Sequence, residues 1–205
     1  MLYGTSLSLG VFSFFATWKI IGIGKVLLLK ADLFGKDLNK AGAREDKPKV
    51  PEGLGIVPAI IFLMMAIQLQ VFLSLPDHKL VEYNAGLLSI CMSILLGFAD
   101  DFVDLAWRYK LIVPTIATFP LLVAYKGLTS VVMPLQVRPY LGDTLDLGLI
   151  YKIYMGSLSV FCTNSINIYA GINGIEVGQS FIIGCFVMIH NIIEIWRAES
   201  ELIVS

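Results

Sequence analysis

The sequence predicts an all-α integral membrane protein, a single domain of residues 1–205 with about six transmembrane helices. Two observations carry this prediction. The 205 residues are 57% apolar and only 15% charged, with a mean hydropathy of +0.78. Long runs without a charged residue also recur along the chain, and a helix needs about 20 mostly apolar residues to cross a bilayer. These features exclude a water-soluble domain, and the net charge of −1 gives no indication of nucleic-acid binding.

The uncharged runs place the six helices in order near residues 4–28, 56–76, 83–100, 111–125, 150–170 and 178–196. The first run lacks the basic start and the cleavage site of a signal peptide, so we expect it to be a retained span. The fourth run is short and contains Pro114 and Pro120, which leaves its ends least defined. The whole set predicts a polytopic helical bundle.

Basic residues orient these helices. Six lie in the 30–55 segment, and Arg108 and Lys110 follow the third run, whereas only four lie in the opposite segments. The positive-inside rule therefore places the 30–55 loop, the turn near residue 104 and the loop after the fifth span on the cytoplasmic side. The 126–147 segment is then luminal. Its stretches 129–133, 136–137 and 144–147 are divided by proline and glycine, which predicts a small hairpin.

Three aspartates crowd into the turn after the third span, in the sequence GFADDFVDLAWRYK. Asp100, Asp101 and Asp104 share one helix face, where like charges repel. One carboxylate would be enough to mark a membrane boundary. Three gain most from a divalent cation or a cationic partner, and oxygen ligands suit Mg²⁺ together with substrate phosphates. Lys110 could supply positive charge to a phosphate at the same place.

The end of the fifth span carries a second polar cluster, in the sequence FCTNSINIYAGINGIE. Asn164 and Asn167 are three residues apart and share a helix face. Polar side chains within a span usually face the bundle interior or a cavity. They could bond neighbouring helices together, ligate a metal through their carbonyl oxygens, or bind a nucleobase or a phosphate through their NH₂ groups.

A third polar stretch, GKDLNK at 35–40 followed by PEGLG at 51–55, would by itself be a connector. Taken with LLGFADD at 95–101, WRYKLIVPT at 107–115 and VFCTNSINIYAGINGIEVGQS at 160–180, it resembles the polyprenyl-phosphate N-acetylhexosamine-1-phosphate transferases. The eukaryotic members, which transfer GlcNAc-1-phosphate from UDP-GlcNAc to dolichyl phosphate in the endoplasmic reticulum membrane, are the closer match. The resemblance implies this activity on the cytoplasmic face, the first step of lipid-linked oligosaccharide synthesis for N-glycosylation. It also implies a Mg²⁺ cofactor, and a homodimer is one expected form of the full-length enzyme.

The resemblance also implies residue roles. Asp100, Asp101 and Lys110 would be the catalytic group, with Lys110 on the donor diphosphate, and Asn167 would be a Mg²⁺ ligand. The role of the acidic pair stays open between a base and support of the metal through water. The uridine and sugar parts of the donor would contact Lys36, Asp37, Leu38, Glu52 and Asn173. The groove for dolichyl phosphate would be lined by Val160, Phe161, Cys162, Thr163, Asn164, Ser165, Ile166, Asn167 and Ile168.

Two departures from the family accompany this resemblance. Asp104 stands where eukaryotic members commonly have Asn, which could alter metal or phosphate contacts. The family also continues for several further spans, with a second aspartate ligand for Mg²⁺ and an Arg- and His-rich loop. His78 and His190 do not replace these groups. We therefore expect this chain to correspond to the N-terminal half of such an enzyme and to be inactive alone.

Two other classes of protein stay open. A Mg²⁺-dependent membrane prenyltransferase would also use a DDxxD motif, but it should carry a second aspartate-rich motif some spans later. A transporter or a non-catalytic membrane subunit would use the Asn pair and Lys19 as pore or interface features. The clustering at the cytoplasmic face suits a surface site better than a site at the midplane.

Overall fold

The computed structural model describes residues 2–36, 48–103, 105–169 and 174–204. It divides into two compact units, Met1–Thr163 and Asn164–Ser205. Long helices make up most of the described chain: α1 (Leu2–Lys30), α2 (Ile56–Leu69), α3 (Asp77–Val103), α4 (Trp107–Ala124), α6 (Leu149–Tyr169) and α7 (Ile175–Val204). The mostly helical architecture expected from the apolar runs is confirmed.

Three helices within the described residues are long and apolar enough to cross a membrane, over Gly4–Lys30, Asp77–Val103 and Ile175–Ala198. The apolar helix α2 is shorter, at 14 residues. Large apolar side chains are exposed along these helices, as at Trp18 (73%) and Phe181 (71%), which suits a surface that faces lipid. The chain is thus an all-α membrane protein, and its six-span topology stays a prediction.

The helix bounds differ from those expected at four helices. Helix α4 begins at Trp107 rather than 111, and α7 ends at Val204 rather than 196. Helix α2 ends at Leu69 rather than near 76, because the N–H groups of Gln70, Val71 and Phe72 turn back to carbonyls three residues earlier. Helix α3 begins at Asp77 rather than 83, because the Pro76 carbonyl accepts hydrogen bonds from the next turn. An apolar run marks only the lipid-compatible part of a helix, and the polar first turn of α3 extends beyond it.

Helix α4 continues through both of its prolines, Pro114 and Pro120. Proline is tolerated in membrane helices where neighbouring groups satisfy the backbone that it frees. Pro114, Ala117, Thr118 and Ala124 are buried. Small side chains on this face let other helices approach closely, which is the usual basis of helix packing in membranes.

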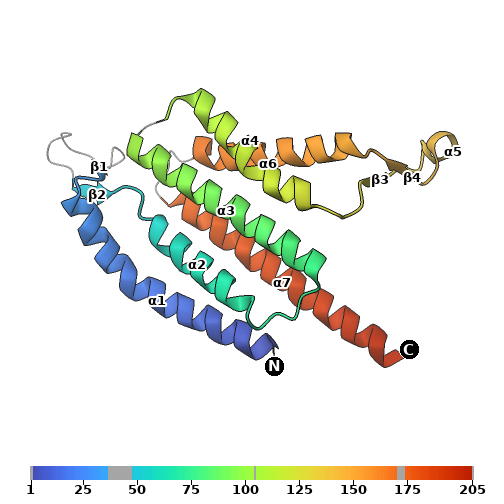
Figure 1. The fold of residues 1–205 in the computed structure, drawn as a ribbon, viewed down its shortest axis with the longest axis horizontal. Helices are drawn as coiled ribbons and strands as arrows, with labels where there is room; N and C mark the ends of the chain where they lie inside the picture. The colour runs from blue at the N-terminus through green and yellow to red at the C-terminus, as the bar shows by residue number, and fades with distance from the viewer. Residues whose placement is uncertain (1, 37–47, 104, 170–173, 205) are drawn as a thin grey trace. The chain divides into compact units, whose positions relative to one another are not determined.

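Close helix contacts organise the first unit, in which α1, α2 and α3 lie side by side (Figure 1). A Cβ added at Gly24 of α1 would lie 2.7 Å from Val57 Cγ2 of α2. Gly86 of α3 lies opposite Leu121 of α4, with a Cβ there 4.0 Å from Leu121 Cδ1. The absence of a Cβ at Gly24 therefore allows the close approach of α1 and α2, whereas a Cβ at Gly86 would make an ordinary van der Waals contact.

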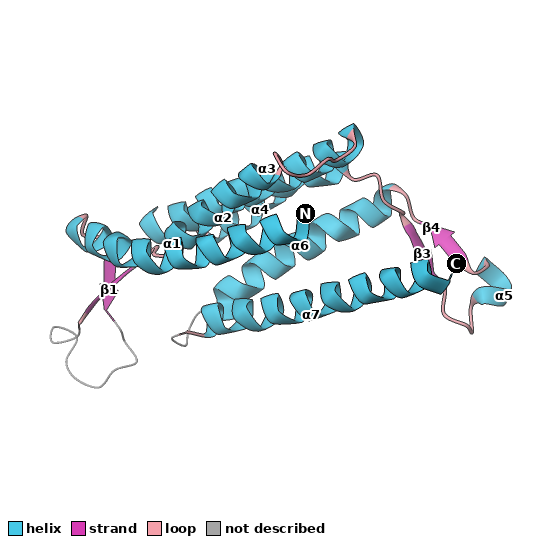
Figure 2. Ribbon diagram, turned by 90° about the horizontal axis from the view of Figure 1, so that it is seen from below, coloured by secondary structure: helices cyan, strands magenta, loops and turns pink. Residues whose placement is uncertain are grey.

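Two short antiparallel ribbons lie at opposite ends of this unit (Figure 2). At one end β1 (Phe34–Lys36) pairs with β2 (Lys49–Pro51), with Gly35 opposite Val50. The sequence predicted only a loop there. At the other end β3 (Ser130–Val132) pairs with β4 (Thr144–Asp146) around the short helix α5 (Arg138–Leu141). This second ribbon lies in the segment expected to form a hairpin, although the 136–137 stretch joins neither strand.

Asp146 is expected to make the β3–β4 ribbon sensitive to acid. Its Oδ1 accepts hydrogen bonds from the Thr129 hydroxyl and the Gly148 N–H, and these bonds lower the pKa of the carboxyl group. A lowered folded-state pKa adds stability above the unfolded value of about 3.9, and that stability is lost as the pH falls through the folded value. Protection of the Leu147 amide, which donates to the Thr129 carbonyl, should therefore decrease between about pH 5 and pH 3.

Hydrogen exchange of the chain in nanodiscs, corrected for the intrinsic effect of pH, would measure this protection. The matched variant Thr129→Val removes the hydroxyl donor at nearly constant volume and should reduce the acid sensitivity. An equal acid response in both proteins would contradict the role given to Asp146.

Candidate functional site

The stretch that contains the aspartates of the DDxxD motif, called the acidic turn below, lies where α3 ends and α4 begins. Asp100 and Asp101 occupy the last turn of α3, and Lys110 lies in the first turn of α4. Asp104, the third aspartate of the motif, lies outside the described residues. The helix bounds therefore place the two adjacent carboxylates and the lysine at one end of the first unit.

Asp100 and Lys110 form an ion pair across this turn, with 2.9 Å between Lys110 Nζ and Asp100 Oδ1. The Lys110 side chain is 28% exposed and the Asp100 side chain 14%. The same oxygen of Asp100 accepts a hydrogen bond from the Leu105 N–H at 3.2 Å. One carboxylate thus connects the end of α3, the connecting turn and the start of α4.

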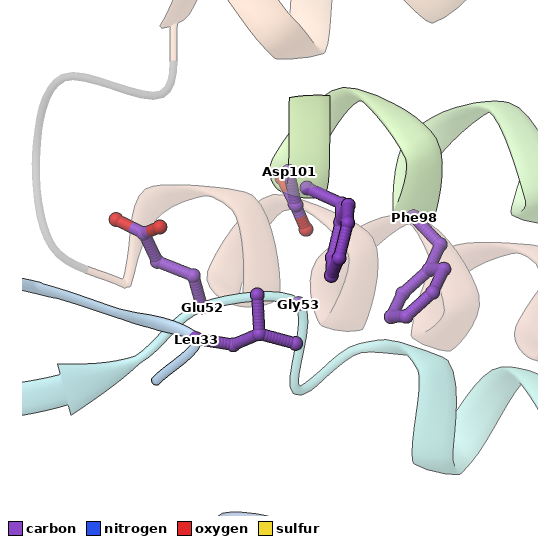
Figure 3. Close-up of a pocket in the computed structure, with 6 residues that line it drawn as sticks. Leu33, Glu52, Gly53, Phe98 and Asp101 are labelled. Carbon is purple, nitrogen blue, oxygen red and sulfur yellow. The ribbon is translucent and has the colours of Figure 1, made fainter. Parts of the chain in front are cut away.

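Asp101 faces a different part of the unit. It lines a small, partly open hollow together with Leu33, Glu52, Gly53, Phe98 and Phe102. Phe98 and Asp101 point from α3 toward the segment that carries Glu52 and Gly53 (Figure 3). Residues from segments far apart in the sequence therefore line one hollow.

Gly53 is required for this approach. Its φ of +68° lies in the left-handed region, which favours glycine. A Cβ at this position would lie 3.5 Å from Asp101 Oδ2 and 3.6 Å from the Phe98 ring. The backbone turn at Gly53 brings the start of α2 against the end of α3.

The β1–β2 ribbon positions Glu52. A backbone hydrogen bond of 3.2 Å from the Glu52 N–H to the Leu33 carbonyl extends the ribbon by one residue. The Glu52 carboxylate lies over Gly35 of β1, where an added Cβ would meet Oε1. Leu33 lies three residues after the end of α1, where Asp32 (φ +56°) adopts a left-handed conformation and the Leu33 N–H donates to the Leu28 carbonyl.

The remaining predicted site residues are placed as follows. Lys36 ends β1, half-buried and opposite Lys49, whereas Asp37, Leu38 and Asn173 lie outside the described residues. Val160 to Ile168 belong to α6, where Phe161, Cys162, Thr163 and Ile168 are exposed and Val160, Asn164, Ser165 and Ile166 are half-buried. Asn167 lies on the same helix, and its side chain is not among those described.

The structure therefore brings together two of the three predicted stretches, the 30–55 segment and the acidic turn. Both belong to the first unit. The third stretch is divided, since Val160 to Thr163 belong to the first unit and Asn164 to Ile168 to the second. The proximity of Asn167 to the acidic turn stays a prediction.

Comparison with known proteins identifies the family. A model described as glycosyl transferase family 4 matches residues 83–205, which is more than half of the chain. The chain belongs to this family. Among curated proteins, the UDP-N-acetylglucosamine–dolichyl-phosphate N-acetylglucosaminephosphotransferase of Dictyostelium discoideum is 50% identical over 203 residues, covering 93% of this chain and 50% of that relative.

The enzyme of the same name from Saccharomyces cerevisiae is 35% identical over 217 residues, covering 90% of this chain and 47% of its own length. A phospho-N-acetylmuramoyl-pentapeptide-transferase of Acetivibrio thermocellus is 24% identical over 200 residues, covering 92% of this chain and 57% of its own length. The chain thus spans about half the length of the curated relatives it matches. The family resemblance of the sequence motifs is confirmed.

The side chains around the hollow test whether this member of the family could hold the Mg²⁺ that the resemblance implies. Among the described residues, no three His, Cys, Asp or Glu side chains gather closely enough to form a metal cage. Asp101 and Glu52 come from segments that line one hollow, and carboxylate oxygens are ligands that Mg²⁺ prefers. The Glu52 carboxylate, however, lies over Gly35 and points away from Asp101 (Figure 3). Asp101 is therefore the one carboxylate of the hollow that fits the ion, and because Mg²⁺ usually keeps waters and substrate phosphates in its shell, the ion would be held largely by substrate.

Leu33, Phe98 and Phe102 were not predicted as part of the site of this family member. The two phenylalanines are four residues apart and flank Asp101 on α3, with ring centroids 6.4 Å apart. This spacing is a sequence signal that could have identified them, because side chains at i and i+4 share a helix face. No comparable signal marks Leu33, whose place depends on the turn at Asp32.

Proposed function

We propose that this chain supplies the donor-binding part of an enzyme that transfers GlcNAc-1-phosphate from UDP-GlcNAc to dolichyl phosphate. The observation that carries the proposal is the meeting of the hollow between Glu52 and Asp101 with the Asp100–Lys110 pair at one end of the first unit. The names of the relatives from Dictyostelium and yeast support the same reaction.

The donor would be held by the segments around this hollow. Glu52, with Lys36, Asp37, Leu38 and Asn173, would contact the uridine and sugar parts, and Lys110 would contact the diphosphate. Asn167 would hold Mg²⁺ through its amide oxygen, and the ion would neutralise charge on the phosphates. The exposed side chains of α6 from Phe161 to Thr163 suit contact with the lipid acceptor.

The reaction needs positioning and charge neutralisation more than an activated nucleophile. A phosphate monoester has a second pKa near 6, so the acceptor is largely ionised at neutral pH. One of its oxygens would attack the β-phosphorus of UDP-GlcNAc. The bond from that phosphorus to the bridging oxygen would break, giving GlcNAc-diphospho-dolichol and UMP. Lys110 would stabilise the negative charge that develops on the leaving UMP.

The topology proposed with this function has six spans in the endoplasmic reticulum membrane. The charge bias supports a cytoplasmic position for the site and a luminal position for the β3–β4 ribbon. Cysteine labelling at residue 143 tests the orientation, since labelling only from the cytosol would reverse it.

A chimaera tests the function. Residues 1–205 would replace the matched half of the Dictyostelium relative, which is 50% identical to this chain. In membranes, the chimaera should convert labelled UDP-GlcNAc and dolichyl phosphate to the diphospholipid, and it should exchange labelled UMP into UDP-GlcNAc. An inserted chimaera that does neither, beside an active parent, would overturn the proposal. Transfer of a prenyl group instead would favour the prenyltransferase alternative.

Gly35→Ala in the chimaera is expected to weaken donor binding while the fold is kept. The new Cβ would meet the end of the flexible Glu52 side chain, which can move away. The carboxylate would then leave its place over Gly35, and the KM for UDP-GlcNAc should rise roughly fivefold, the effect of about 1 kcal/mol.

Gly55→Ala is the matched control for this variant. Gly55 lies on the same PEGLG segment with a helical φ of −58°, and an added Cβ there meets nothing within 4 Å. Equal donor KM values for the two variants would show that the position of Glu52 is not used.

A further inference from the structure

The two adjacent carboxylates of the acidic turn make different contacts. Asp101 lines the hollow beside Gly53, whereas Asp100 contacts Lys110 and the backbone of Leu105. Consecutive residues of a helix point about 100° apart, so the two side chains cannot serve one ligand in the same way. The two carboxylates of the DD motif therefore lie in different environments.

Two contacts of Asp100 lie within the connection from α3 to α4. Its Oδ1 accepts from both Lys110 Nζ and the Leu105 N–H. A metal ion at that oxygen would have to displace the lysine, since ammonium and metal would compete for it. An oxygen shared by a lysine and a backbone N–H is suited to hold a side chain in place.

The side chain of Lys110 needs a partner to keep it in one conformation. A lysine side chain has four rotatable bonds and loses much conformational entropy when it is fixed in one place. The carboxylate of Asp100 fixes it before any donor arrives, and at 14% exposure the aspartate is sheltered from much of the screening by water. A side chain that is already oriented lowers the entropic cost of binding the donor.

We propose that Asp100 is a positioning residue for Lys110 and that Asp101 is the carboxylate that faces the donor. Asp100 holds the ammonium group of Lys110 at the place where it meets the donor diphosphate, and it neither ligates the metal nor removes a proton. This inference rests on the proposed function and deepens it.

The test is a double-mutant cycle in the chimaera with Asp100→Asn, Lys110→Ala and the two combined. Asparagine keeps an oxygen for the Leu105 N–H but loses the charge that holds the lysine. The donor KM should rise about tenfold in Asp100→Asn, between the effects of an exposed and a buried ion pair. The apparent constant for Mg²⁺ should stay within about twofold.

In the Lys110→Ala background, Asp100→Asn should change donor binding by less than about twofold, because the lysine through which it acts is already absent. Calorimetric binding of UDP-GlcNAc measures this step even where turnover is slow. Asp143→Asn, at the exposed end of the β3–β4 ribbon, controls for the chemical change itself. Thermal unfolding of each variant separates a loss of fold from a loss of position.

The outcomes are distinct. An unsubstituted chimaera without transfer, beside an active parent, would overturn the proposed function and this inference with it. If the unsubstituted chimaera is active, any of three results would overturn this inference and leave the proposed function standing. These are an unchanged donor KM in Asp100→Asn, a raised constant for Mg²⁺, or an Asp100→Asn effect of equal size with and without Lys110.

Discussion

Replacing Asn167 with Ala in the chimaera is expected to abolish GlcNAc-1-phosphate transfer while membrane insertion is unchanged. The substitution removes an amide oxygen assigned to Mg²⁺, and no group on the alanine can replace it. Loss of residues that merely support a metal ligand costs about 10- to 100-fold in activity, so loss of the ligand itself should cost on the order of 100-fold or more. Transfer assays over a range of Mg²⁺ concentrations measure the effect.

Asn191→Ala is the matched control for this substitution. Asn191 is also an asparagine on an apolar helix, but it is exposed on α7 and carries no assigned role. Its replacement should leave transfer close to that of the parent chimaera. Mg²⁺-dependent transfer retained by Asn167→Ala would count against the ligand assignment.

Lys110→Ala is expected to lower kcat/KM for UDP-GlcNAc on the order of 100-fold, as loss of one donor to a developing charge does in other enzymes. The substitution removes the cation assigned to the diphosphate and leaves Asp100, only 14% exposed, without the lysine of its ion pair. The apparent affinity for dolichyl phosphate should change much less, because the lipid groove is assigned to α6.

Steady-state kinetics with each substrate varied in turn separate these two effects. Lys126→Ala, an exposed lysine just beyond the other end of α4, is the matched control. A change confined to the apparent affinity for the lipid would show that Lys110 faces the acceptor rather than the donor.

The helices could be predicted from the sequence because the signal for a membrane helix is local. An uncharged run of sufficient length must satisfy its own backbone in lipid, and a helix does so within the segment. The same reasoning could not find the first turn of α3, since Asp77 and His78 are polar residues in water. Helix α4 was less well defined because the effect of Pro114 and Pro120 depends on neighbouring helices.

The β1–β2 ribbon could not be predicted for a different reason. Its strands have three residues each, too few to show an alternation, and they lie in a polar and basic segment. Contacts such as Gly53 with Asp101 depend on a left-handed backbone turn and on segments far apart in the sequence. Motif resemblance named Glu52 and Asp101 separately, and only the fold places them at one hollow.

The adjacent aspartates of the acidic turn repel one another, and the fold offsets part of this repulsion with an ion pair. The sequence suggested a cation or a cationic partner for these carboxylates, and Lys110 supplies the partner for Asp100. The sequence could thus predict which residues belong to the site. The different contacts of Asp100 and Asp101 could be seen only in the structure.

The Asp100–Lys110 pair also bears on how fast a donor arrives. A nucleotide sugar is an anion, and a cluster of bare carboxylates would slow its approach through long-range repulsion. Pairing with lysine cancels one of these charges close to its source, so the field felt by the incoming anion is weaker. Repulsion of this kind is screened beyond about 10 Å at 0.1 M salt. The association rate should therefore depend on ionic strength less than the number of aspartates suggests.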